Sequence, residues 1–158
     1  MKVSDRVKEI DSTSRRVLRA LDTNPRATVG WVAQKLHLAR GTVQSRISQL
    51  FEPGVLRNHS VTVPPEALGY GIRAICTAEV EQELFDDAVA ALRDLPEVLE
   101  CVATTGGTDL FMQLVARDAD DLYVLNQTVL GCPGIRRTST TIVLRELIPY
   151  RIHQLLAD

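Results

Sequence analysis

Residues 28–51 read TVGWVAQKLHLARGTVQSRISQLF, and this stretch decides how the first part of the chain folds. Its apolar residues recur at helical spacing in two short runs that a tight turn separates. Thr28 can cap the first helix, and the second runs from about Arg40 to Glu52. Four apolar residues share one side of the second helix: Val43, Ile47, Leu50 and Phe51. The stretch therefore predicts two helices that meet at a short turn, with this apolar side facing a core.

The opposite side of the second helix carries hydrogen-bonding side chains and no acid. In the DNA major groove, arginine suits guanine, glutamine suits adenine and serine or threonine suits either, whereas an acid would be repelled by phosphate. The pattern predicts a helix-turn-helix whose second helix binds in the groove. A small helical bundle with a merely solvated polar face is the alternative. The outward residues include Ser48, and those expected to contact DNA are Arg40, Thr42, Gln44, Ser45, Arg46 (on the flank) and Gln49.

A third helix precedes this pair, and a stop follows it. Asp11 is suited to cap a helix that ends near Asn24-Pro25. Glu52-Pro53-Gly54 ends the helical pattern, because proline cannot continue a helix and glycine accepts a positive φ. We therefore expect a three-helix DNA-binding domain over residues 1–56. A linking strand from Arg57 to Val63 and a hinge then fill residues 57–67.

Charge divides the chain at the same place. Residues 1–63 hold eleven Lys/Arg and five Asp/Glu, a net charge of +6, whereas residues 64–158 hold seven and fifteen, a net charge of −8. The net charge of the whole chain, −2, hides this asymmetry. A basic module joined to an acidic one suggests that the first part meets a polyanion such as double-stranded DNA.

The pattern of the second part is strand, helix, strand, strand, helix, strand. Residues 72–80 alternate at strand spacing, residues 84–95 trace a helix face, and Gly106-Gly107 separates two further strands. Two βαβ halves predict an α+β fold, a ferredoxin-like sandwich over residues 68–158 with both helices on one face of the sheet. Because the other face needs cover, we expect a homodimer. The remaining expected elements are strands over 98–104, 110–116 and 135–147 and a helix around 122–129.

Several classes of protein are excluded by composition. The chain has 158 residues, 45% apolar, and no apolar run of the roughly 18 residues that a membrane-spanning helix needs. The first eleven residues carry several charges and no hydrophobic core, so we expect no signal peptide and a cytoplasmic protein associated with the nucleoid. Three cysteines without a C-x-x-C spacing, and three scattered histidines, predict no disulfide framework, metal site or cofactor. No serine or cysteine has a paired His/Asp arrangement, so we expect no enzyme.

The order and spacing of short motifs resemble the Lrp/AsnC (leucine-responsive, feast/famine) family of transcription regulators. The resemblance covers nearly the whole chain, from Ile10 to about Leu147. It is carried in the first part by VLRAL (17–21), RAT (26–28), VAQKL (32–36), VQSRISQL (43–50) and PGVL (53–56), and in the second part by TGGTDL (105–110) and PGI (133–135).

The resemblance implies an N-terminal helix-turn-helix and a C-terminal domain that binds amino acids or related metabolites. It also implies dimers joined through their C-terminal sheets, often assembled into octamers, with the effector at a subunit interface. Arg46 falls on the family's recurrent recognition-helix arginine. Gly106, Gly107 and Asp109 fall on its effector loop, and Thr141 and Ile142 fall on last-strand positions linked to the same response.

The chemistry of this loop suits a zwitterion. Glycine amides can receive an effector carboxylate, and a carboxylate such as Asp109 can meet its ammonium group. With few bulky residues nearby, we expect a small amino acid. A simple tight turn with Asp109 capping the hairpin is the other interpretation. At the level of the whole protein, two alternatives to an effector-binding regulator remain: a tetrapyrrole-decarboxylase-like enzyme of the same architecture, and an architectural DNA-binding protein without effector.

The sequence departs from the family pattern at the turn of the helix-turn-helix. Ala39 stands where a capping serine is usual, which typically costs about 1 kcal/mol, and His37 stands where the backbone is left-handed. Gly41 adds flexibility inside the second helix, and Ser14 replaces the second acid of the family's opening motif. These changes bear on the DNA sequence that is read and not on the fold.

Overall fold

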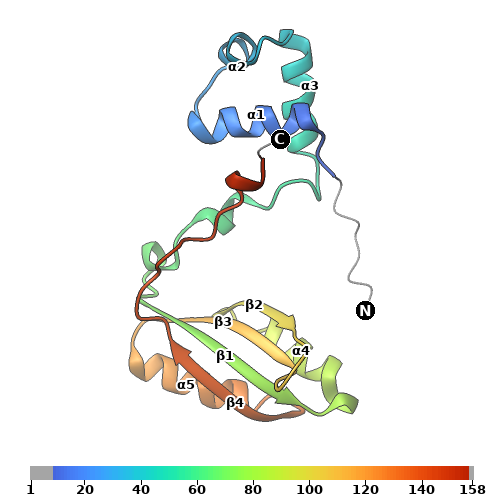
Figure 1. Ribbon diagram of the computed structural model, residues 1–158. Helices are drawn as coiled ribbons and strands as arrows, with labels where there is room; N and C mark the ends of the chain where they lie inside the picture. Colours follow the sequence, from blue (N-terminus) through green and yellow to red (C-terminus); the bar gives the residue numbers. More distant parts are fainter. Residues whose placement is uncertain (1–8, 157–158) are drawn as a thin grey trace. The chain divides into compact units, whose positions relative to one another are not determined.

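A computed structural model describes residues 9–156, and they divide into two compact units (Figure 1). The first unit runs to Thr62 and also takes in the segment from Ile148 onward, and the second spans Val63–Leu147. The prediction that the chain has no signal peptide concerns mainly the charged residues at positions 2, 5, 6 and 8, which lie outside the described residues. No described helix is long and apolar enough to cross a membrane.

The helical unit contains the three predicted helices, α1 (Ser12–Thr23), α2 (Val29–Leu36) and α3 (Arg40–Leu50). Asp11 caps α1 by accepting a hydrogen bond from the Ser14 N–H at 2.7 Å. The Thr28 hydroxyl caps α2 by accepting from the Trp31 N–H at 3.2 Å. Both caps were predicted from the sequence.

The turn between α2 and α3 has the conformation that the family resemblance implies. His37 ends α2 in the left-handed region, with φ 55° and ψ 46°. Ala39 precedes α3 and makes no side-chain cap, so the first N–H groups of this helix lack the partner that a serine would supply. Helix α3 therefore begins without a local side-chain anchor.

Two buried apolar residues from each helix form the core of the helical unit. The prediction that Phe51 belongs to this core is wrong, since its side chain is 56% exposed. The reason is that α3 ends at Leu50 and Phe51 is its C-cap, just before the turn at Pro53-Gly54. The buried residues are Val17 and Ala20, Val32 and Ala33, and Val43 and Leu50.

The predicted linking strand over 57–63 is also wrong. In its place the chain forms a 3-10 helix, His59–Thr62, and a second one follows at Pro65–Leu68. Local hydrogen bonds use the backbone N–H groups here, such as that of Val61, which donates to the Asn58 carbonyl at 3.1 Å. Pro64 and Pro65, which follow, have no N–H to donate to a neighbouring strand.

The second unit is a four-stranded antiparallel sheet with two helices packed on one face (Figure 1). The strand order β2-β3-β1-β4 and the βαββαβ succession confirm the ferredoxin-like prediction. Strand β4 ends at Ile142, five residues earlier than expected. The elements are β1 (Ile72–Val80), α4 (Phe85–Arg93), β2 (Val98–Ala103), β3 (Leu110–Ala116), α5 (Ala119–Leu130) and β4 (Ile135–Ile142).

The core of the second unit lies between the sheet and these helices. Alternate residues of β1, among them Ala74, Cys76 and Ala78, are buried there, and β3 contributes Leu110, Met112 and Leu114. The other face carries apolar side chains that stay in solvent, including Ile75 at 37% exposed and Val102 at 42% exposed. The sheet is thus covered on one side only within the described chain.

The last described residues belong to the helical unit, although the sequence analysis included them in the second domain. A short 3-10 helix, His153–Leu156, packs against α1. Leu156 is buried, and the Arg57 guanidinium lies 5.6 Å from the centre of the Tyr150 ring. Apolar contact with α1 accounts for this placement.

The turn into β4 depends on a glycine. Gly134 has φ +75°, and a Cβ there would lie 2.6 Å from the Leu84 Cβ. Its carbonyl accepts from the Glu81 N–H at 2.8 Å. We expect Gly134→Ala to destabilise the protein by about 1–3 kcal/mol, through left-handed strain and overlap. Denaturant unfolding measures this, and Gly107→Ala, where a Cβ meets open space, is the control that should stay near wild type.

Candidate DNA-binding and effector sites

Four of the six residues predicted to contact DNA are exposed on α3. These are Arg40, Thr42, Gln44 and Ser45, and Ser48 is exposed as well. The opposite side of the helix is held in the core by Val43 and Leu50. Because Val43 and Leu50 are buried, the hydrogen-bonding side of α3 faces solvent. A helix that enters the major groove requires such an exposed side.

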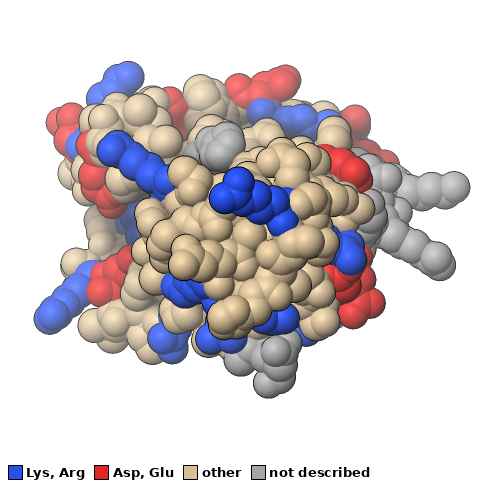
Figure 2. Space-filling view, turned by 90° about the horizontal axis from the view of Figure 1, so that it is seen from above, with Lys and Arg blue, Asp and Glu red and all other residues tan. Residues whose placement is uncertain are grey.

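The surroundings of α3 favour a polyanion. No Asp or Glu occurs between Asp22 and Glu52 in the sequence, and the basic residues Arg26, Lys35 and Arg40 of this stretch are exposed. Figure 2, which looks down on the helical unit, shows basic and uncharged side chains in the middle of the view. This face attracts phosphate without repelling it.

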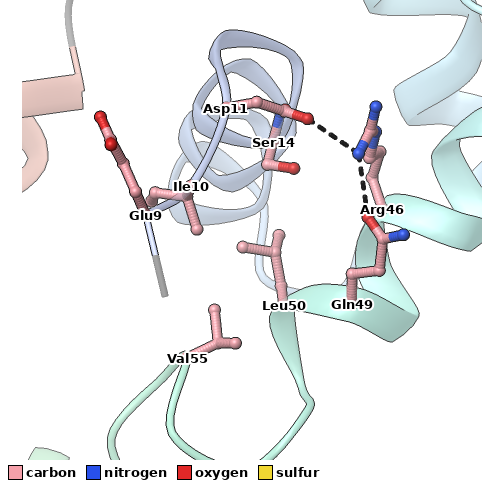
Figure 3. A pocket seen from close by; sticks show the side chains of 8 residues that line it. All are labelled: Glu9, Ile10, Asp11, Ser14, Arg46, Gln49, Leu50 and Val55. Carbon is pink, nitrogen blue, oxygen red and sulfur yellow. Dashed lines mark hydrogen bonds and ion pairs between the residues drawn. The ribbon is translucent and has the colours of Figure 1, made fainter. Parts of the chain in front are cut away.

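The other two predicted DNA contacts, Arg46 and Gln49, are engaged within the protein (Figure 3). The Arg46 Nη1 atom lies 2.8 Å from Asp11 Oδ2 and donates to Gln49 Oε1 at 2.9 Å. The pKa of Asp11 is lowered, mainly because the Ser14 N–H donates to its carboxylate, and the Arg46 charge acts in the same direction. This pairing could not be predicted from local patterns, because Asp11 and Arg46 lie 35 positions apart in the sequence.

Arginines also fix α2. The Arg16 guanidinium of α1 donates to the Leu36 carbonyl at the end of α2, at 3.0 Å. The Arg40 guanidinium lies against α2 at Gly30, where an added Cβ would stand 3.6 Å from it. A polar contact therefore joins the end of α2 to α1, and the Arg40 side chain packs beside α2.

The predicted effector loop is the turn between β2 and β3. Its ends are joined by the Thr104 N–H, which donates to the Asp109 carbonyl at 2.9 Å. Gly106 has φ +122°, and Gly106 and Gly107 are exposed with open space where a Cβ would point. The two glycines leave room for a ligand to approach the backbone amides.

Asp109 has an internal role in this loop. Its Oδ2 accepts from the Val80 N–H at 2.8 Å, and its Oδ1 lies 3.4 Å from the Gln82 amide nitrogen. The carboxylate thereby fastens the hairpin to the end of β1. Asp109 thus has the capping role that was the alternative interpretation of this residue. Its carboxylate still retains lone pairs for a ligand.

Within one chain, Thr141 and Ile142 do not lie beside this loop. Thr141 pairs with Ile75 and Ile142 with Ala74, on the β4 side of β1. The Asp109 N–H donates instead to the Ala78 carbonyl, on the β3 side. The three residues from Ile75 to Ala78 span about 10 Å of strand. The loop and these two last-strand residues therefore do not form one site within the described chain.

Other chemistry has little support among residues 9–156. No group of three or more His, Cys, Asp or Glu side chains there could hold a metal ion. Burial raises the pKa of the thiols of Cys76, Cys101 and Cys132, which makes them poor nucleophiles. The two surfaces described above are thus the candidates for function.

A helix-turn-helix unit joined to a ferredoxin-like unit defines a class of DNA-binding regulators. Residues 10–50 match the model of the AsnC-type helix-turn-helix domain, and residues 73–152 match that of the Lrp/AsnC ligand binding domain. The chain belongs to the Lrp/AsnC family and is a DNA-binding transcriptional regulator with a ligand-binding domain.

Individual relatives agree with this assignment. The HTH-type transcriptional regulator FL11 of Pyrococcus horikoshii is 26% identical over 86% of this chain and 90% of its own length. The structure of E. coli AsnC is 28% identical, with a TM-score of 0.81 over 92% of this chain and 99% of that one. The feast or famine regulatory protein of M. tuberculosis, complexed with L-methionine, is 29% identical with a TM-score of 0.78, at the same coverage. The two relatives described by function, FL11 and the feast or famine regulatory protein, are both regulators.

We expect Asp109→Ala to destabilise the sheet unit by about 1–3 kcal/mol, because the Val80 N–H loses its acceptor. Asp109→Asn keeps an oxygen for this bond and should cost less. Denaturant unfolding distinguishes the two variants, with Gln82→Ala as a control that removes only the longer contact. Equal stability of Asp109→Ala and wild type would contradict the fastening role.

Proposed function

We propose that this regulator binds operator DNA sequence-specifically through the exposed side of α3. Arg40, Thr42, Gln44 and Ser45 are the residues proposed to meet the DNA. The observation that carries the proposal is this acid-free, exposed hydrogen-bonding surface, held outward by Val43 and Leu50. Family membership supports it, since the matched model over residues 10–50 is that of a DNA-binding domain.

We further propose that an amino acid binds at the open β2–β3 loop and controls the assembly of the chain. The exposed glycines of the loop support a site for its carboxylate. A relative is described as complexed with L-methionine, which supports an amino acid as the ligand class. Thr141 and Ile142 of a second chain would form the opposite wall, because those of the same chain lie on the far side of β1.

The proposed assembly is a homodimer that combines into octamers. The uncovered sheet face supports it, because Ile75 and Val102 remain exposed there among apolar neighbours. Association of two such faces would bury them in a symmetric interface.

The DNA-binding proposal is tested with a duplex that the wild-type protein selects from random sequences. We expect Gln44→Ala to weaken binding of this duplex by about 1–3 kcal/mol while changing binding to a scrambled duplex much less. Fluorescence anisotropy over a range of salt concentrations measures both. The matched control is Gln127→Ala, which truncates an exposed glutamine of α5. Unchanged discrimination in Gln44→Ala would contradict base reading at this position.

The effector proposal is tested by calorimetry with each of the twenty amino acids, followed by sedimentation with and without the one that binds. We expect binding by wild type and by Gly107→Ala and its loss in Gly107→Val, whose branched side chain fills the space over the loop. The ligand should also shift the oligomer distribution. Equal binding by Gly107→Val contradicts the loop site, and the absence of any binding favours an architectural protein without effector.

A further inference from the structure

Arg46 lies on the flank of α3 that faces the start of α1 (Figure 3). Its guanidinium contacts the Asp11 carboxylate at 2.8 Å and the Gln49 side-chain oxygen at 2.9 Å, both through Nη1. The Arg46 and Asp11 side chains are 32% and 48% exposed. Both predicted base-reading groups, the guanidinium and the glutamine oxygen, are therefore directed toward a partner inside the protein.

Asp11 joins two helices with one carboxylate. Oδ1 accepts from the Ser14 N–H and caps α1, whereas Oδ2 receives Arg46 from α3. Ser14, directly beside this contact, is buried, as is Leu50. The ion pair thus lies at the edge of the core, between the first turn of α1 and the last turns of α3.

The direction of Arg46 differs from that of the exposed residues. Successive residues are turned by about 100° around a helix, so Arg46 and Ser48 point to nearly opposite sides of α3. Ser45 and Ser48 are exposed, while Arg46 and Gln49 are only partly so. The solvent-facing surface of α3 is thus centred away from Arg46.

We propose that Arg46 and Gln49 are positioning residues that fasten α3 to the capped start of α1, and that bases are read by other residues of α3. The proposal rests on the proposed function, in which α3 binds DNA. It follows that Arg46 has a second task. It neutralises a carboxylate that would otherwise stand unpaired on a DNA-binding unit and repel phosphate.

This proposal predicts how substitutions at the two positions combine. Arg46→Ala leaves the Asp11 charge unpaired, and we expect it to weaken binding to the selected and the scrambled duplex by the same factor, about three- to tenfold at low salt. Asp11→Asn removes the charge but keeps the cap, since asparagine caps helices as well as aspartate does. The double variant Asp11→Asn with Arg46→Ala should therefore bind more tightly than Arg46→Ala alone.

Arg46→Lys separates the two roles further. Lysine can still pair with Asp11 as a point charge, but it lacks the planar fork that suits guanine. Discrimination between the two duplexes should stay within about twofold of wild type in Arg46→Lys and in Arg46→Ala, whereas Gln44→Ala reduces it about tenfold or more. Melting curves establish that each variant is folded at the assay temperature.

The outcomes are distinct. A loss of discrimination in Arg46→Ala that Asp11→Asn does not relieve overturns the proposal, because Arg46 then reads a base. Intact discrimination together with relief by Asp11→Asn supports it. Two other results would count against the proposed function instead: a wild-type protein that does not discriminate between the duplexes, or a Gln44→Ala variant that still does. In either case, the recovery of DNA affinity when Asp11→Asn is added to Arg46→Ala can still be measured on either duplex.

Discussion

Helix α1 is the frame on which the DNA-binding unit depends. The unit's core has only two buried apolar residues from each helix, and so small a core limits how firmly packing alone can fix the helices. Polar contacts from α1 add to it at both ends: Arg16 reaches the last carbonyl of α2, and Asp11 receives Arg46 from α3. Since α3 starts at Ala39 without a side-chain cap, its position rests on these contacts with α1 and on its core side chains rather than on its own first turn.

The sheet unit uses a carboxylate in a similar way. Asp109 follows the glycine turn and bonds to the Val80 N–H, so the loop that carries the exposed glycines is anchored to the end of β1. In the proposed function this anchor would favour ligand binding, because a site whose groups are already in place loses less entropy on binding. In both units, a charged side chain predicted to bind an external partner instead binds a group of the protein itself: Arg46 pairs with Asp11, and Asp109 accepts from the Val80 N–H. Neighbouring residues, such as Gln44 and Gly107, remain exposed.

Much of the fold could be predicted from the sequence, because local rules decide it. Asp11 and Thr28 cap their helices, and alternation places β1 at residues 72–80. The predictions were wrong where non-local contacts or the end of an element determine the structure. These places are the linking segment, Phe51 and the residues after Ile148. In the candidate sites, the sequence placed Gln44 and Ser45 on the exposed side of α3. It could not show that Arg46 meets Asp11, since helical periodicity gives the direction of a side chain but not the partner that tertiary packing brings to it.

The two groups of predicted effector residues, the β2–β3 loop and the end of β4, lie apart within one chain. In the proposed function, this separation is how a ligand could act on DNA binding. The glycine loop adjoins β1 on the β3 side, and Thr141 lies on the β4 side. In the proposed function, a ligand that touches both walls contacts two chains and therefore binds an assembly more tightly than a separated chain. Differential affinity of this kind shifts the equilibrium toward the assembly by mass action. In the proposed assembly each added chain brings another α3, so the assembled form would engage several DNA segments at once. Its overall affinity would then rise without any new contact between a single helix and the groove.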